Sequence, residues 1–423
     1  MKNRIWLLTL LLTLLLSGCA VPTVDQLYAV PARPESYSAL QSVFDGAMKG
    51  LDYASPRNGE NLQTVQMADL DGDGIREYLI FARSDADKSL RILIFAPIGT
   101  RYVLVDTVPC SGTSFDQVEY AQMDGKGGVE LLVGTRISEQ VYRSAVVYTY
   151  LGGKTHQILS TSYVRYLTGD LDADGLAELL VLKPGITDED YGTAAAFRVE
   201  EGVGRRSNEV PLSCPVDKIN RVETGALSDG MDAVFISGED ASAGIVTDVL
   251  ALDRGQLRNA ALEAAPSGEN RLYPADMDGD GILELPAVEK IRDPNGALNQ
   301  QLIRWYTLDS RGTVTDRLFA YQDDTDTWCL TLAESWLPAL RISRDADSVS
   351  FYQEDSETGE VIKIFTVYAL TGQNREANAV IENRFILHKG QQVIYVARLE
   401  VASGALSITQ EDLIRNFRLL DQA

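Results

Sequence analysis

Three short segments of the chain carry carboxylates at one repeated spacing. Each follows the pattern D-x-D-x-D-G-x-x-E, which puts acidic side chains at positions 1, 3, 5 and 9 of a loop. Alternate side chains of a tight loop point toward one centre, glycine at position 6 permits a sharp turn, and the carbonyl group at position 7 can face inward. Such a cage of oxygen atoms suits a hard cation, and Ca²⁺ takes roughly 6–8 oxygen ligands. The predicted ligands are Asp69, Asp71, Asp73, Ile75 and Glu77 in the first loop, Asp170, Asp172, Asp174, Leu176 and Glu178 in the second, and Asp276, Asp278, Asp280, Ile282 and Glu284 in the third.

We call these segments loops 69–77, 170–178 and 276–284, and together the three acidic loops. Four converging carboxylates repel one another strongly unless a cation lies between them. The pattern therefore predicts about three bound calcium ions, one for each loop. Magnesium fits less well, because it prefers octahedral sites that retain several water molecules. The alternative is that the loops are polar turns without a metal.

Two further segments keep the spacing but lose ligands. Segment 122–130 has glutamine at position 1 and Lys126 at position 5. The Lys126 ammonium can lie where a cation would be and pair with Asp124 and Glu130. In segment 224–232 the first three acidic positions hold threonine, alanine and serine. The sequence predicts no metal in either segment.

The five segments recur at a nearly constant interval. Their first residues lie 48 to 54 residues apart, and each segment leads into an apolar strand. Further apolar runs, separated by polar turns, give about four short strands per repeat, which is typical of a propeller blade. One blade has too little core to fold alone, so neighbouring blades must stack. The repeat predicts a mainly β fold, a β-propeller of about 50-residue blades over residues 61–320, with five motifs seen and 5–7 blades possible.

These repeats resemble FG-GAP or VCBS repeats, which occur in integrin-like β-propellers and in many bacterial surface lipoproteins. The resemblance covers roughly residues 62–320 and rests on the aspartate loops. It implies that the loops bind calcium at the turn into the inner part of each blade. It also implies that the propeller is a binding or interaction platform at the cell surface, with a protein or glycan as its ligand.

The N-terminus carries an export signal. A positively charged start precedes a 12-residue apolar run, Ile5–Leu16, which is too short to span a bilayer. The run ends in Leu-Ser-Gly-Cys at residues 16–19, which resembles the lipobox of bacterial lipoproteins. The resemblance implies that residues 1–18 are a signal peptide and that acylated Cys19 anchors the protein outside the cytoplasmic membrane. A plain signal peptide with a chance cysteine is the alternative.

The segments that flank the repeats differ from them in pattern. Residues 19–60 are interpreted as a tether followed by a short helix, expected near Ser38–Leu51. Residues 321–423 lack a complete acidic loop and combine strands with a terminal helix over Thr409–Leu420, which Thr409 can cap. We therefore expect a small C-terminal α+β domain. Additional blades in this region are the alternative.

Net charge and amino-acid composition reduce the number of functional classes that fit the chain. With 38 Lys+Arg against 61 Asp+Glu the net charge is −23, and no basic cluster is present that could hold nucleic acid. The two histidines, His156 and His388, fall in expected turns, and no catalytic motif is recognisable. We therefore predict a non-enzymatic binding module. The alternatives are an exported carbohydrate-active hydrolase or lyase that uses carboxylates or a tyrosine with an arginine, and a structural subunit of an envelope assembly.

Three cysteines follow Cys19 in the sequence. They are Cys110, Cys214 and Cys329. Because their number is odd, at least one is unpaired within the monomer, and none has the spacing C-x-x-C. We expect them mainly to be small buried apolar side chains.

Overall fold

The computed structural model describes residues 35–137, 143–185, 191–240, 243–262, 271–322, 328–400 and 408–420. The fold is mainly β, as the repeat predicts, and its strands form six antiparallel sheets of four or five strands each. Among the described residues, no helix is long and apolar enough to cross a membrane. The predicted signal peptide 1–18 and the predicted lipidation site Cys19 lie outside the described residues.

Each sheet is built almost entirely from strands that follow one another along the chain. The first sheet contains β1 (Leu51–Tyr53), β2 (Val65–Ala68), β3 (Glu77–Ser84), β4 (Leu90–Ile98) and β5 (Arg101–Cys110). The second contains β6 (Ser114–Ala121), β7 (Glu130–Arg136), β8 (Arg143–Leu151) and β9 (Lys154–Tyr163). The third contains β10 (Arg165–Gly169), β11 (Glu178–Lys183), β12 (Thr193–Glu200) and β13 (Val203–Pro211). The fourth contains β14 (Ile219–Ala226), β15 (Asp232–Asp240), β16 (Gly244–Asp253) and β17 (Gln256–Asn259).

The last two sheets lie in the C-terminal part of the chain. The fifth contains β18 (Leu285–Ile291), β19 (Gln300–Leu308), β20 (Val314–Gln322), β21 (Trp328–Leu332) and the C-terminal strand β27 (Phe417–Leu419). The sixth contains β22 (Leu340–Arg344), β23 (Ser348–Glu354), β24 (Val361–Leu370), β25 (Phe385–Lys389) and β26 (Ile394–Leu399). One sheet therefore corresponds to each of the five sequence repeats, and the sixth carries no acidic motif.

The strands differ in burial according to their place in the blade. The second strand of the first blade, β3, is fully buried from Leu79 to Ala82, because it is covered on both faces. The outer strand β5 keeps several exposed or half-exposed side chains along its length. This is the pattern expected for blades whose central strands are enclosed by their neighbours.

Apolar side chains join each sheet to the next. One cluster combines Phe81 of the first sheet with Phe115 of the second, whose ring centroids lie 5.1 Å apart. Similar clusters join the second sheet to the third, the third to the fourth, the fourth to the fifth and the fifth to the sixth. Each blade therefore depends on its neighbour for a large part of its core.

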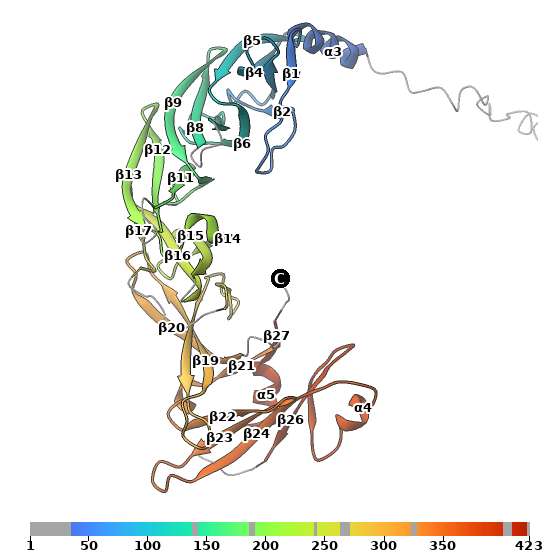
Figure 1. Ribbon diagram of the computed structural model, residues 1–423, viewed down its shortest axis with the longest axis vertical. Helices are drawn as coiled ribbons and strands as arrows, with labels where there is room; N and C mark the ends of the chain where they lie inside the picture. The colour runs from blue at the N-terminus through green and yellow to red at the C-terminus, as the bar shows by residue number, and fades with distance from the viewer. Residues whose placement is uncertain are drawn as a thin grey trace, which may run out of the picture.

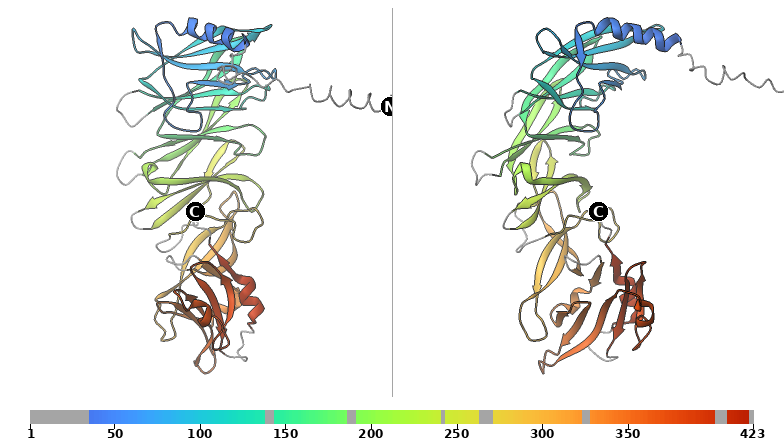
Figure 2. Two further views of the ribbon diagram at one scale, coloured as in Figure 1. Left: turned by 90° about the vertical axis from the view of Figure 1, so that its right-hand side faces the viewer. Right: turned by 45° about the vertical axis from the view of Figure 1, so that its right-hand side comes forward.

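The six sheets follow one another along an open arc (Figure 1). First strands such as β2, β6 and β14 lie on the concave side of the arc, and outer strands such as β9, β13 and β17 lie on the convex side. The first and sixth sheets stand at opposite ends, and Figure 2 shows the same succession from two other directions. The predicted blades are thus present and are stacked in an arc.

Helix α3 (Glu35–Ala47) covers the end of the stack that no preceding blade covers (Figure 2). Its Phe44 packs against Phe95 of the first sheet, with ring centroids 4.8 Å apart. The sequence predicted this helix over Ser38–Leu51, but it ends at Ala47. Gly50, with φ +74°, then turns the chain into β1, which pairs with β3.

The C-terminal region combines the sixth sheet with two short helices, α4 (Arg375–Asn378) and α5 (Gln410–Asn416). It packs against the fifth sheet through one shared apolar cluster, which includes Phe351 and Trp328. The boundary predicted between residues 320 and 321 falls inside β20, which continues to Gln322.

The terminal helix is shorter than the sequence predicted. Thr409 caps it as expected, because its side chain accepts a hydrogen bond from the Asp412 backbone N–H in a capping box. The helix ends at Asn416, whereas the prediction extended it to Leu420. The following residues form β27, because the edge of β21 offers unpaired backbone groups to a returning strand.

Candidate metal centre

Each acidic loop leads into the second strand of a blade. Loop 69–77 joins β2 to β3, and loop 170–178 joins β10 to β11. Loop 276–284 precedes β18, where the first strand is reduced to a single bridge between Ala275 and Glu284. In each case the position-9 glutamate stands at, or immediately before, the start of the second strand.

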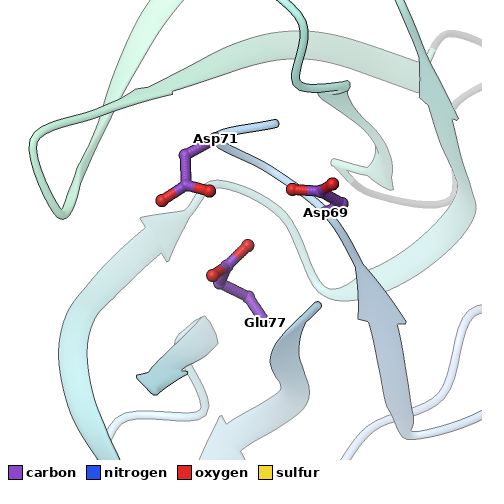
Figure 3. A group of neighbouring side chains, drawn as sticks. All are labelled: Asp69, Asp71 and Glu77. Carbon is purple, nitrogen blue, oxygen red and sulfur yellow. The ribbon is translucent and has the colours of Figure 1, made fainter. Parts of the chain in front are cut away.

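The carboxylates at positions 1, 3 and 9 converge in all three loops. One oxygen from each of the three residues lies within 4.8 Å of the other two. Figure 3 shows this arrangement in loop 69–77, where the three carboxylates face a common space. The structure thus brings together these predicted ligands: Asp69, Asp71 and Glu77; Asp170, Asp172 and Glu178; and Asp276, Asp278 and Glu284.

The loop backbone explains why the pattern needs glycine at position 6. Gly74, Gly175 and Gly281 have φ values of +85°, +88° and +87°. A side chain is disfavoured in this left-handed region, whereas glycine enters it freely. The backbone at position 4 also lies in the left-handed region, where Ala173 has a φ of +59°.

The aspartate at position 1 is held by the backbone of its own loop. Asp69 Oδ1 accepts a hydrogen bond from the Gly72 N–H at 2.8 Å, and Oδ2 accepts one from the Gly74 N–H at 3.0 Å. In loop 276–284, Asp276 accepts from the two corresponding glycines at 2.7 and 3.0 Å. These bonds orient the carboxylate before any ion binds.

The aspartate at position 5 has a different role. Asp73 Oδ1 accepts a hydrogen bond from the Ile75 N–H at 2.7 Å, and the other two loops repeat this bond. The position-5 residues are outside the converging triads. Cation binding by Asp73, Asp174 and Asp280, and by the carbonyl groups of Ile75, Leu176 and Ile282, therefore stays a prediction.

The position-9 glutamates are buried but hydrogen-bonded. Glu77, Glu178 and Glu284 are 1%, 2% and 0% exposed. In each, Oε2 accepts a hydrogen bond from the backbone N–H at position 2, at 2.9, 2.8 and 2.7 Å. Burial and the negative charge of the neighbouring aspartates raise the pKa of all three to about 7. A cation would relieve this repulsion.

The donor set of the triads fits a hard divalent cation. Two of its oxygens, Asp172 Oδ1 and Glu284 Oε1, are buried without a hydrogen-bond partner. A buried carboxylate oxygen without a partner is costly unless an ion coordinates it. All ligands are oxygen atoms, which Ca²⁺ accepts in flexible geometry. The three triads could therefore hold metal ions and are compatible with calcium.

Of the two ion pairs predicted for Lys126 in segment 122–130, the structure confirms the one with Asp124. The Lys126 ammonium lies 2.9 Å from Asp124 Oδ2, so a basic side chain neutralises that loop from within. Glu130 keeps the position-9 hydrogen bond, accepting from the Met123 N–H at 2.8 Å. In the fourth blade, Asp229 accepts hydrogen bonds from the N–H and hydroxyl of Ser310. Neither segment contributes an acidic triad among the described residues.

Loops of neighbouring blades contact one another directly. The Val129 N–H donates to the Asp69 carbonyl at 3.1 Å, and the Ala177 N–H donates to the Gln122 carbonyl at 2.7 Å. The backbones approach so closely that a Cβ on Gly128 would lie 2.2 Å from the Leu70 carbonyl oxygen. An ion that fixes one loop therefore also fixes the junction with the next blade.

Arg317 of β20 is a site residue that the sequence analysis missed. One of its guanidinium nitrogens lies 2.8 Å from Asp278 Oδ2 and also contacts the Asp280 carboxylate. Its Nε lies 3.8 Å from Glu284 Oε1. No local spacing in the sequence indicates this contact, because Arg317 comes from a different strand of the sheet.

An open pocket of about 350 Å³ lies on the side of the first strands, between β6 and β10. Glu119 Oε2 accepts a hydrogen bond from the Thr168 hydroxyl at 2.7 Å, and Asn61 donates to the Val118 carbonyl at 3.1 Å. Burial raises the pKa of Glu119, and the nearby Glu60 adds to the effect. The pocket is lined by Gly59, Glu60, Asn61, Glu119, Tyr120, Leu167 and Thr168.

The cysteines and histidines do not gather at these sites. Cys110, Cys214 and Cys329 are free, and burial raises the pKa of their thiols to about 12, 12 and 11. His156 and His388 are exposed, and they lie in β9 and β25 instead of in turns. The expectation that the cysteines are small buried side chains is confirmed for Cys214 and Cys329, while Cys110 is half-buried.

Comparison with known proteins gives distant structural likenesses. No protein-family model and no curated protein matches the chain. A protein from Lactobacillus plantarum has a TM-score of 0.30 at 13% identity, covering 73% of this chain and 85% of its own. The exotype rhamnogalacturonan lyase YesX scores 0.27 at 12% identity, covering 75% of this chain and 63% of its own. Rhamnogalacturonan lyase PL11 of Bacillus licheniformis scores 0.28 at 12% identity, with 74% and 64% covered.

The chain thus spans less than two thirds of either lyase. Scores this low carry no argument about function. The blade architecture described above rests on the strand pairing of this chain, and its assignment to FG-GAP or VCBS repeats stays a prediction.

Proposed function

We propose that the chain is a lipid-anchored, extracytoplasmic binding module whose blades are held together by calcium. The observation that carries this proposal is the position of the three acidic triads, in loops that each pair with a segment of a neighbouring blade. Loop 276–284 does so through a bridge between Ile282 and Ala226 of the fourth blade. An ion there neutralises the converging carboxylates and fixes each loop against its neighbour. Because such an ion binds only the folded chain, it stabilises that state by mass action.

The N-terminal sequence supports the location. The Leu-Ser-Gly-Cys segment that ends at Cys19 is the place of the lipid anchor, and a net charge of −23 disfavours direct contact with anionic headgroups. The lipid would hold the protein at the membrane while the acidic folded part stands away from it. The loops would then meet extracytoplasmic calcium.

The pocket between β6 and β10 is where we place the ligand. Its volume of about 350 Å³ lies within the range of small-ligand sites, roughly 300–1,000 Å³. Carboxylate, amide and hydroxyl groups line it, so a glycan with several free hydroxyl groups fits its hydrogen-bonding capacity. Glu60 and Glu119 would repel an anionic ligand.

An exported hydrolase or lyase is the second candidate. The observation that favours it is the presence of two carboxylates, Glu60 and Glu119, in one open pocket, because paired carboxylates can serve as general acid and base. Release of product from a glycan that binds would distinguish this candidate from a binding module.

Thermal unfolding of the full-length chain in detergent tests the role of calcium. After treatment with EDTA, we expect calcium to raise the melting temperature more than magnesium does. At a calcium concentration of 100 Kd, one site contributes about 2.7 kcal/mol of stability. Asp71→Asn should reduce the rise, whereas Glu357→Ala, an exposed residue far along the chain in the sixth sheet's hairpin, should not. Equal melting temperatures in EDTA and calcium would contradict the proposal.

A further inference from the structure

The three acidic loops are alike in sequence but differ in what surrounds them. Arg317 reaches loop 276–284 from β20 and contacts Asp278 at 2.8 Å, with its Nε 3.8 Å from Glu284. Among the described residues, no ion pair reaches the acidic positions of loops 69–77 and 170–178. Arg198 lies near Asp172, but its guanidinium pairs with Glu200 at 2.5 Å.

The register of the sheets explains why only one loop has such a partner. β20 carries a bulge at Arg317, between Asp316 and Leu318. The outer strands of the first and second blades bulge at the corresponding places, where the extra residues are Val105 and Ile158. These residues are apolar in the first two blades. In the third blade, which carries loop 170–178, the outer strand bulges at Ser207 and Asn208, which are uncharged. The fifth blade therefore places a cation where the other two blades with an acidic loop have an uncharged side chain.

We propose that Arg317 occupies the cation position of loop 276–284, so that this loop holds calcium much more weakly than loops 69–77 and 170–178. The inference rests on the proposed calcium binding and assigns different calcium affinities to the three acidic loops. An arginine side chain keeps its charge at any pH that the protein meets. Calcium must therefore displace the guanidinium from two aspartates or bind beside a like charge.

The contact with the buried glutamate of the same loop is incomplete. Glu284 Oε1 is buried and has no hydrogen-bond partner, because Arg317 Nε lies 3.8 Å away. The guanidinium charge therefore offsets part of the negative charge of the loop, while this oxygen stays available to an ion. The chain uses this device elsewhere, because Lys126 neutralises segment 122–130 by pairing with Asp124 at 2.9 Å.

The site is partly open to solvent, which limits how much Arg317 can weaken calcium binding. The side chains of Arg317 and Asp278 are 32% and 34% exposed, so their attraction is screened by water. We therefore expect weakened calcium binding at this loop, not its abolition. The expected ratio of dissociation constants between this loop and the other two is roughly tenfold or more.

Calorimetric titration of the full-length chain with calcium, after removal of bound metal, tests the inference. The wild-type chain should show two tight sites and one weak site. Arg317→Met keeps most of the apolar stem and removes the charge, and it should tighten the third site by roughly tenfold or more. Arg304→Met is the matched control. It removes an arginine of the same sheet that pairs with Glu289 and Asp316, and it should leave the weak site weak.

A second variant makes the test independent of how Arg317→Met folds. Asp278→Asn in the wild-type background should leave two tight sites, because the tight ions occupy the other loops. Three equally tight sites in the wild-type chain, or a weak site unchanged by Arg317→Met, would overturn the inference while leaving the proposed calcium binding intact. No tight site at all would refute both.

Discussion

The position-9 glutamate serves the backbone as well as a cation. In the three acidic loops its Oε2 accepts a hydrogen bond from the N–H at position 2. Glu130 keeps this bond in segment 122–130, where the cation ligands at positions 1 and 5 are lost. The glutamate is therefore needed wherever a buried N–H must be satisfied at the turn into the second strand. The side chain at position 1 also accepts a backbone hydrogen bond in segment 122–130, where Gln122 Oε1 accepts from the Gly125 N–H at 3.2 Å. What this segment loses at positions 1 and 5 is the negative charge that a cation requires.

Replacing Glu130 separates these two roles. Glu130→Ala leaves the Met123 N–H without its partner in a buried position, which costs about 1–3 kcal/mol. Because Lys126 neutralises this segment, we expect the same loss in calcium and in EDTA, measured by urea unfolding. Glu357→Ala, which removes an exposed glutamate, is the control and should change the stability little. A loss confined to calcium-containing buffer would show that segment 122–130 binds metal after all.

The sequence predicts the triads well because their geometry is local. Positions 1, 3 and 9 converge through the turn of one short loop, so spacing alone brings Asp69, Asp71 and Glu77 together. Asp73 shows where prediction from spacing fails. The spacing makes its carboxylate a cation ligand, whereas in the structure the carboxylate accepts a hydrogen bond from the Ile75 N–H. The contact of Arg317 with this site could not be predicted from the sequence, since only the register of the folded sheet brings β20 beside loop 276–284.

At the scale of elements, interior strands follow their apolar pattern closely, whereas ends of elements do not. The apolar pattern predicts strands over Trp328–Leu332 and Val361–Leu370, and β21 and β24 have these bounds. The helix expected over Thr409–Leu420 ends early, because pairing of its last residues with β21 outweighs continuation of the helical turn. Helix periodicity contains no information about the open strand edge that its residues meet.

Helix α3 is the element whose packing can be tested most simply. Phe44 lies between Tyr78 and Phe95, with ring centroids 5.4 and 4.8 Å away. Phe44→Ala removes this contact from the uncovered end of the stack and should cost about 3–5 kcal/mol of unfolding free energy. Ser42→Ala, an exposed position on the same helix, is the control. A loss as small as that of the control in urea unfolding would show that the first blade is stable without its helix.

At the scale of the whole molecule, the spacing of the repeats predicts how many blades form, but it does not predict how the blades are arranged. The interval of 48 to 54 residues predicts one blade per repeat, and the sheets confirm it. The angle between neighbouring blades depends on side chains at each junction, such as Phe81 against Phe115. The repeat interval therefore does not predict the open arc in Figure 1. It leaves a concave side, lined by the first strands, on which the pocket is exposed.

This concave pocket leads to a prediction about the ligand. The charge of the chain and the carboxylates of Glu60 and Glu119 favour glycans that are neutral or carry amino groups, and disfavour glycans built from uronic acids. We expect this order of affinity when the full-length chain is titrated with neutral, amino and uronic-acid oligosaccharides in the presence of calcium. Glu119→Gln keeps the shape of the side chain and should weaken the preferred glycan by roughly tenfold, about 1.4 kcal/mol.

The controls make this prediction specific to the pocket. Glu357→Ala should bind glycans as the wild-type chain does. The melting temperature of Glu119→Gln should stay close to that of the wild type, because the glutamine oxygen can still accept the hydrogen bond from Thr168 and the Gln117 amide can turn its own oxygen toward the new NH₂ group. Preferred binding of uronic-acid oligosaccharides, or unchanged affinity in Glu119→Gln, would place the ligand elsewhere. Release of shortened sugars during the titration would instead show that the two carboxylates act as acid and base, since binding alone leaves the glycan intact.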